Sequence, residues 1–135
     1  MESLVTGSSF KNIFKEKKVF VTGHTGFKGA WLITWLNLLQ AEIKGYALAP
    51  EQKESIYNKI ASQVKHESII SDIRNKAKLK EEIISFQPDF IFHLAAQPLV
   101  RQSYLIPSET FDINVTGTAN LLEAVISLEK KCTVI

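Results

Sequence analysis

Residues 19–31 read VFVTGHTGFKGAW, and this segment carries the strongest structural signal in the chain. It passes from a β-branched and aromatic run, typical of a buried strand, into a Leu- and Trp-rich run that predicts a helix. Gly23, Gly26 and Gly29 occupy the turn between them at a spacing of three residues. We expect these glycines to allow a tight turn, a close approach of the backbone to a ligand, and close contact between helix and strand. The first N–H groups of the helix carry partial positive charge, so the turn is predicted to bind the pyrophosphate of a dinucleotide.

Outward from this turn, strand-like and helix-like segments alternate along the chain. The predicted strands are 17–23, 42–48, 67–73, 89–96 and 132–135, and the predicted helices are 29–40, 54–64, 75–86 and 107–131. Alternation of this kind, with most strands apolar on both faces, indicates a doubly wound α/β fold with a parallel sheet and helices on both faces. We expect residues 1–16 to form a flexible arm and residues 17–135 to form one partial dinucleotide-binding domain that ends within its fifth strand.

The amino-acid composition of the chain limits the kinds of binding partner and the cellular compartment that we expect for it. The 135 residues are 45% hydrophobic and 22% charged, with a net charge of +2 and scattered lysines, which favours neither nucleic acid nor a membrane surface as a partner. Cys132 is the single cysteine, so a disulfide framework is excluded and a reducing cytoplasm is expected. We interpret Cys132 as a buried hydrophobe rather than a nucleophile. No leader-like segment is found, and His66 and His93 have no second ligand at metal spacing, so no metal site is predicted.

Two further positions agree with a dinucleotide site. Asp72 follows the predicted third strand, where its carboxylate can accept a hydrogen bond from an adenine amino group; the alternative is that it caps the next helix. Ala95 and Ala96 end the fourth strand and are small enough for a cofactor to lie across them. In the glycine-rich turn, His24 and Lys28 either add donors and positive charge beside the pyrophosphate or point to solvent.

The motifs TGHTGFKG (22–29), DIR (72–74), FHLAAQ (92–97) and NVTGTANLLEA (114–124) occur in the order and spacing of one family. On them, residues 17–135 resemble the extended short-chain dehydrogenase/reductase family, and within it the lyases that dehydrate nucleotide sugars. The resemblance implies a Rossmann-like fold, a tightly held NAD, a nucleotide-sugar substrate, deoxysugar synthesis as the setting and a homodimer or larger homo-oligomer. It also implies a redox cycle in which NAD takes a hydride from C4 of the sugar, water leaves across C5 and C6, and the hydride returns to C6.

The resemblance assigns roles to individual residues of this chain. The pyrophosphate is assigned to the glycine turn, the adenine end to the DIR motif, the wall of the cofactor site to the end of the fourth strand, and the substrate to the loop that follows. The cofactor-binding residues are Gly23, His24, Thr25, Gly26, Phe27, Lys28, Gly29, Asp72, Ile73, Leu94, Ala95, Ala96 and Asn114, and the substrate-binding residues are Gln97 and Arg101.

Two departures from the family pattern are visible. The position where a carboxylate usually binds the adenosine ribose holds Leu-Ala-Pro (48–50), with Glu51 just beyond. No tyrosine has a lysine four residues later, as the family's catalytic YxxxK element requires. We therefore expect the catalytic groups to lie beyond Ile135 and the chain alone to be inactive. Another epimerase or dehydratase of the family, and a noncatalytic module that senses NAD, remain as alternatives.

The predicted helix 29–40 carries an apolar face besides the one that covers the sheet. This second face consists of Trp31, Trp35 and Leu38, at helical spacing. It is expected to pack against further elements, to form an oligomer contact, or to be covered by Phe10 and Phe14 of the N-terminal arm.

Overall fold

The structure, a computed structural model, describes residues 12–135. The strands are β1 (Lys18–Thr22), β2 (Glu42–Ala47), β3 (Glu67–Ile70), β4 (Phe90–His93) and β5 (Thr133–Val134). The helices are α1 (Phe27–Leu38), α2 (Ile56–Ile60), α3 (Lys76–Phe86), α4 (Val100–Leu105), α5 (Pro107–Phe111) and α6 (Gly117–Ile126), and a π-helical segment, η3 (Asp112–Thr116), joins α5 to α6.

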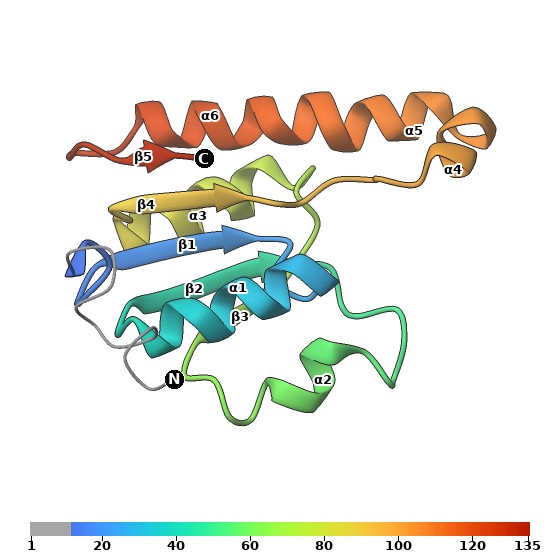
Figure 1. The fold of residues 1–135 in the computed structure, drawn as a ribbon. Helices are drawn as coiled ribbons and strands as arrows, with labels where there is room; N and C mark the ends of the chain where they lie inside the picture. Colours follow the sequence, from blue (N-terminus) through green and yellow to red (C-terminus); the bar gives the residue numbers. More distant parts are fainter. Residues whose placement is uncertain (1–11) are drawn as a thin grey trace.

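The strands form a single sheet in the order β3-β2-β1-β4-β5, and every pairing is parallel. Right-handed crossovers place α1 and α2 on one face and α3 and α6 on the other, as Figure 1 shows. The Rossmann-like doubly wound fold predicted from the sequence is thus confirmed. All strands point the same way, so the loops that follow β1, β3 and β4 meet at one edge of the sheet.

The two faces of the sheet bury separate apolar cores because successive strand residues point to opposite sides. On the α3 and α6 side, Phe20 and Ile91 of the sheet pack with Leu79, Ile83 and Leu121. On the α1 and α2 side, the buried residues are Val19, Val21, Ala30, Ile33, Leu36, Ile43, Tyr57 and Val64. Each fully buried large aliphatic or aromatic side chain contributes about 1.5–3 kcal/mol, so both helical layers are firmly attached to the sheet.

Several predicted boundaries are wrong in detail. The helix expected over 54–64 is reduced to the five residues of α2, and the helix expected over 107–131 ends at Ile126 and contains the π-helical turn η3. Helix α4 was not predicted at all, because its six residues, which lie between Pro98 and Pro107, are too few to show a helical period.

Part of the predicted N-terminal arm belongs to the packed domain. Residues 1–11, including Phe10, lie outside the described residues. Residues 12–16 form a turn in which Phe14 packs on β4, with ring centroids 5.1 Å from Phe90 and 6.1 Å from Phe92. On the second apolar face of α1, Trp31 remains 58% and Leu38 52% exposed in this structure.

Candidate functional site

Two of the three glycines in the turn between β1 and α1 are required by the fold itself. Gly23 has φ +75°, and a Cβ atom there would lie 2.8 Å from the carbonyl carbon of Leu94. A Cβ on Gly29 would lie 2.1 Å from the carbonyl oxygen of Gly23, so only glycine lets α1 begin this close to the end of β1. The Gly23 N–H donates to the carbonyl of Tyr46 at 2.9 Å, which fixes the turn to β2.

Gly26, the middle glycine, differs from the other two. It precedes the first turn of α1 with φ −74° and ψ 171°, a conformation open to any residue, and it is exposed. A Cβ there would meet no atom closer than the Gly23 carbonyl oxygen at 3.4 Å, an ordinary contact. Folding therefore does not demand glycine at this position, whereas an anion bound against the N–H groups of α1 would occupy the space a side chain needs.

His24 lies behind the turn, and both predictions made for its side chain are wrong. The imidazole is fully buried, with Nε2 2.7 Å from Ser68 Oγ of β3 and the ring edge-on to Tyr57 of α2. It fits there because Gly45 has no side chain: a Cβ at Gly45 would lie 2.3 Å from the ring. Burial, together with the neighbouring His66, lowers the pKa of His24 to about 4, so the ring is neutral at pH 7 and supports the turn rather than reaching a phosphate.

The remaining side chains of the turn divide between structure and solvent. The Thr25 hydroxyl donates to the carbonyl of Leu48 at 2.8 Å and ties the turn to the segment after β2. Phe27 and Lys28, in the first turn of α1, are exposed. Lys28 is thus placed where its charge can face an anion at the helix N-terminus, and its phosphate role stays a prediction.

A directed chain of hydrogen bonds fixes the loop after β4. The Ala95 N–H donates to Thr22 Oγ1 at 3.1 Å, and Thr22 Oγ1 lies 2.8 Å from His93 Nδ1. His93 Nε2 lies 2.9 Å from Thr118 Oγ1, whose proton goes to the carbonyl of Asn114. Thr118 must therefore accept from His93 Nε2–H, which leaves Nδ1 as the acceptor for Thr22. Burial lowers the pKa of His93, in agreement with this neutral form.

Asn114 holds the same loop from the helical side. It lies in η3, where its Oδ1 accepts from the Gln97 N–H at 2.7 Å and its Nδ2 donates to the Gln97 carbonyl at 3.1 Å. The Gln97 side chain is engaged within the protein, since its Oε1 accepts from Leu99 N–H and its Nε2 donates to Thr110. Arg101 is exposed on α4. The structure thus brings Asn114 and Gln97 together, and their predicted ligand roles remain predictions.

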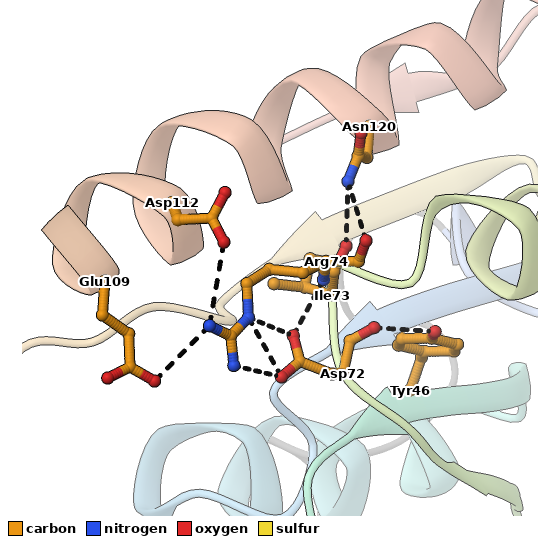
Figure 2. A network of polar contacts seen from close by, with 7 residues as sticks. All are labelled: Tyr46, Asp72, Ile73, Arg74, Glu109, Asp112 and Asn120. Carbon is orange, nitrogen blue, oxygen red and sulfur yellow. Dashed lines mark hydrogen bonds and ion pairs between the residues drawn. The ribbon is translucent and has the colours of Figure 1, made fainter.

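Asp72 lies in the loop after β3, and Figure 2 shows its surroundings. The alternative that Asp72 caps the next helix is wrong, because the N-cap of α3 is Asn75, whose side chain accepts from Lys78 N–H. The carboxylate is instead bound by Arg74, with Nη2 2.7 Å from Oδ2. Ile73 points inward: its side chain is buried beneath α6, so a ligand contact with Ile73 would fall to its main chain.

The end of β2 supplies no carboxylate for a ribose, as the sequence predicted. β2 ends at Ala47, and the following Leu48 and Ala49 are exposed. Glu51, the next acidic residue, is exposed and belongs to neither β2 nor α2.

Sequence reasoning missed three residues that shape this edge of the sheet, namely Thr22, Arg74 and Thr118. All three lie within the quoted motifs, but the motifs do not mark their pairings, because the partners His93 and Glu109 lie 25 to 71 residues away in sequence. Arg74 was visible as part of the DIR motif, but its partner Glu109 is 35 residues further along.

The glycine turn at the carboxyl end of β1, in a parallel sheet of this order, defines a Rossmann-like protein with the architecture of dinucleotide-binding domains. A family model described as GDP-mannose 4,6 dehydratase matches residues 20–135, and the chain belongs to this family. This confirms the resemblance inferred from the motifs.

Among relatives, the CDP-glucose 4,6-dehydratase of Salmonella typhimurium is 50% identical over 115 residues, which are 85% of this chain and 32% of that enzyme. A UDP-glucose 4-epimerase of Mycoplasma genitalium is 29% identical over 113 residues, 84% of this chain and 33% of the epimerase. The chain thus spans about one third of the length of these relatives.

Solved structures of the same fold include UDP-glucose 4-epimerases. The enzyme from Stenotrophomonas maltophila, with bound NAD and a formylated UDP-arabinopyranose, matches with TM-score 0.76 and 23% identity over 87% of this chain and 35% of its own. The Thermus thermophilus enzyme in complex with NAD matches with TM-score 0.70 and 29% identity over 80% of this chain and 33% of its own.

Residues 12–135 contain neither a metal-ligand cluster nor a helix that could span a membrane. No cluster of histidine, cysteine and acidic side chains in this range has the geometry of a metal site. None of the helices in the same range has both the length and the hydropathy of a membrane span.

Proposed function

We propose that this chain is the NAD-binding part of a nucleotide-sugar 4,6-dehydratase, a lyase that converts CDP-glucose to CDP-4-keto-6-deoxyglucose and water. The observation that carries the cofactor assignment is Gly26, an exposed residue whose missing side chain leaves space in front of the N-terminus of α1 that the fold does not need. The choice of CDP-glucose rests on the 50% identity to the Salmonella enzyme.

The residues at the sheet edge fit a dinucleotide in an extended arrangement. The pyrophosphate would lie against Gly26 and the first N–H groups of α1, with Lys28 beside it. Asp72, two strands away at the end of β3, would accept a hydrogen bond from the adenine amino group. Ala95 would face the nicotinamide half, on the loop that Asn114 and its neighbours hold in place.

The chemistry divides between the cofactor and acid–base groups that this chain does not contain. NAD bound at this site would supply a hydride acceptor for C4 of the sugar and a hydride donor for C6, so the cycle would have no net oxidation. Tyr46, Tyr57 and Tyr104 all lack a lysine four residues later. The described residues accordingly would bind and orient the cofactor, and they supply no tyrosine–lysine pair of YxxxK spacing for removal of the C4 hydroxyl proton.

Calorimetric titration with NAD tests the cofactor assignment. We expect the parent protein to bind NAD and Gly26→Val to weaken binding by at least about tenfold, which corresponds to 1.4 kcal/mol. Because φ and ψ at Gly26 suit any residue, the variant should fold, and its free energy of unfolding should fall by no more than about 1 kcal/mol, the usual cost of a poorer N-cap residue. Ala119→Val, on the exposed side of α6, is the matched control and should bind like the parent.

Two outcomes contradict the proposal. A parent protein that does not bind NAD removes the cofactor assignment. Equal affinity of the parent and Gly26→Val shows that the glycine turn is not the site. The sugar nucleotide is tested separately, by titrating the NAD-loaded protein with CDP-glucose, UDP-glucose, dTDP-glucose and GDP-mannose; tighter binding of any other than CDP-glucose overturns that part of the proposal.

A further inference from the structure

The side chain of Arg74 extends from the loop after β3 toward the helical segment α5–η3, and it contacts three carboxylates (Figure 2). Its guanidinium forms a two-point contact with Asp72, with Nε 3.0 Å from Oδ1 and Nη2 2.7 Å from Oδ2. On the other side, Nη1 lies 3.4 Å from Glu109 Oε1 and 3.7 Å from Asp112 Oδ2. The side chain is about one-third exposed, at 33%, so these contacts are shielded from water only in part.

The contacts with Arg74 leave the Asp72 carboxylate one acceptor position. Oδ1 accepts the Arg74 backbone N–H at 2.8 Å and the Nε–H at 3.0 Å, while Oδ2 accepts Nη2–H and shares the Nε–H at 3.1 Å. Three donor protons thus fill most of the roughly four lone-pair positions of a carboxylate. The guanidinium also holds the pKa of Asp72 below its usual range, so at neutral pH the group is ionised and can only accept hydrogen bonds.

The main chain of this loop is held from both of its sides. Tyr46 of β2 donates its hydroxyl proton to the carbonyl of Asp72 at 3.0 Å. Asn120 of α6 directs Nδ2 to the carbonyls of Ile73 and Arg74, at 3.4 and 3.5 Å. Neither the backbone nor the guanidinium can therefore turn without breaking several contacts, and the remaining acceptor position of Asp72 has a fixed direction.

From this geometry we infer that Arg74 is a positioning residue that makes the cofactor site selective for a 6-amino purine. The inference rests on the proposed function, because it takes Asp72 as the group that meets the adenine. Adenine presents a 6-amino donor to this acceptor, whereas hypoxanthine presents a 6-oxo acceptor, which an ionised carboxylate repels. A carboxylate freed from Arg74 can rotate or take up a proton, and a protonated carboxyl donates to the 6-oxo group.

The test compares NAD with nicotinamide hypoxanthine dinucleotide, which differs from NAD only at the purine. We expect calorimetry to give a preference for NAD of about tenfold or more in the parent protein, since hydrogen bonds to charged groups contribute on this scale. Arg74→Gln should reduce the preference to less than about threefold. Arg74→Lys keeps the positive charge but loses the two-point contact of the guanidinium, so its preference should lie between those of the parent and Arg74→Gln. Asp72→Asn, whose amide can donate to the 6-oxo group, should abolish or reverse the preference.

A matched control separates this role from general stability. Lys76→Gln removes a neighbouring exposed ion pair, to Glu123 of α6, and should keep the preference of the parent protein. If Arg74→Gln and Arg74→Lys weaken both dinucleotides by the same factor, Arg74 is only structural and the inference is overturned. If the parent binds both equally, the inference fails while the proposed NAD site stands; if it binds neither, the proposed function fails as well.

Discussion

The buried imidazole of His24 predicts a specific dependence of stability on pH. Burial next to His66 lowers the pKa of His24 from 6.5 to about 4 in the folded protein, whereas the unfolded chain keeps the ordinary value. At pH values between about 4 and 6.5, the imidazole of His24 is protonated in the unfolded state and neutral in the folded state. The free energy of unfolding therefore falls as the pH is lowered through 6.5. By linkage, this single group removes about 2 kcal/mol of unfolding free energy between pH 8 and pH 5, and about 3 kcal/mol once the pH is below 4.

Urea unfolding at pH 8 and pH 5 measures this effect. His24→Gln removes the titrating group and should reduce the difference in unfolding free energy between the two pH values by about 2 kcal/mol relative to the parent. The carboxylates and His93 titrate alike in both proteins and cancel in the comparison. Lys28→Gln, on the exposed side of the same turn, should keep the pH dependence of the parent. If His24→Gln loses as much stability on acidification as the parent does, the ring is not held neutral by burial and our interpretation of the turn is refuted.

Three other outcomes are expected. Gly29→Ala should lower the unfolding free energy by about 3 kcal/mol or more in urea titrations, because its Cβ would overlap the carbonyl of Gly23, and a variant as stable as the parent would contradict the packing described here. Glu82→Gln should cost about 1–2 kcal/mol in the same assay, because Lys44 loses its 2.9 Å carboxylate partner but keeps the ion pair to Glu67 at 3.2 Å, and a neutral effect would contradict a contribution of this pair to stability. Cys132, whose pKa is raised by burial, should react with a disulfide reagent several-fold more slowly than free cysteine at pH 8, and a faster rate would refute its description as a hydrophobe.

The fold was predictable because its signals are local and repeat along the chain. Most strands contain a short apolar run bounded by polar or turn residues, and parallel strands with right-handed crossovers leave few possible strand orders. The errors occur where local signals are weak. Two short helices, α2 and α4, have five and six residues and show too little periodicity to be bounded or found.

The position of the glycine turn was predictable from the sequence, whereas the orientation of the His24 side chain was not. The glycine spacing located the turn and the start of the helix, yet nothing in GHTGFKG tells which side of the turn His24 occupies. That is decided by Gly45 on β2, whose missing side chain makes room for the ring. The partners of Arg74 were beyond prediction for a related reason, since Glu109 and Asp112 approach it only after the chain has passed through β4.

Because the segment from Pro107 to Ile126 contains the π-helical turn η3, its exact number of residues is more important for the position of α5 than the identity of its exposed residues. A π turn is an α-helix that has accommodated one extra residue, so removing a single residue from Asp112–Thr116 would restore a regular α-helix and rotate α5 by about 100° relative to α6. Asn114 would then no longer reach the backbone of Gln97 in the loop after β4, although no side chain would have been substituted. Point substitutions on the exposed side of this helix should be tolerated, whereas single-residue deletions should not.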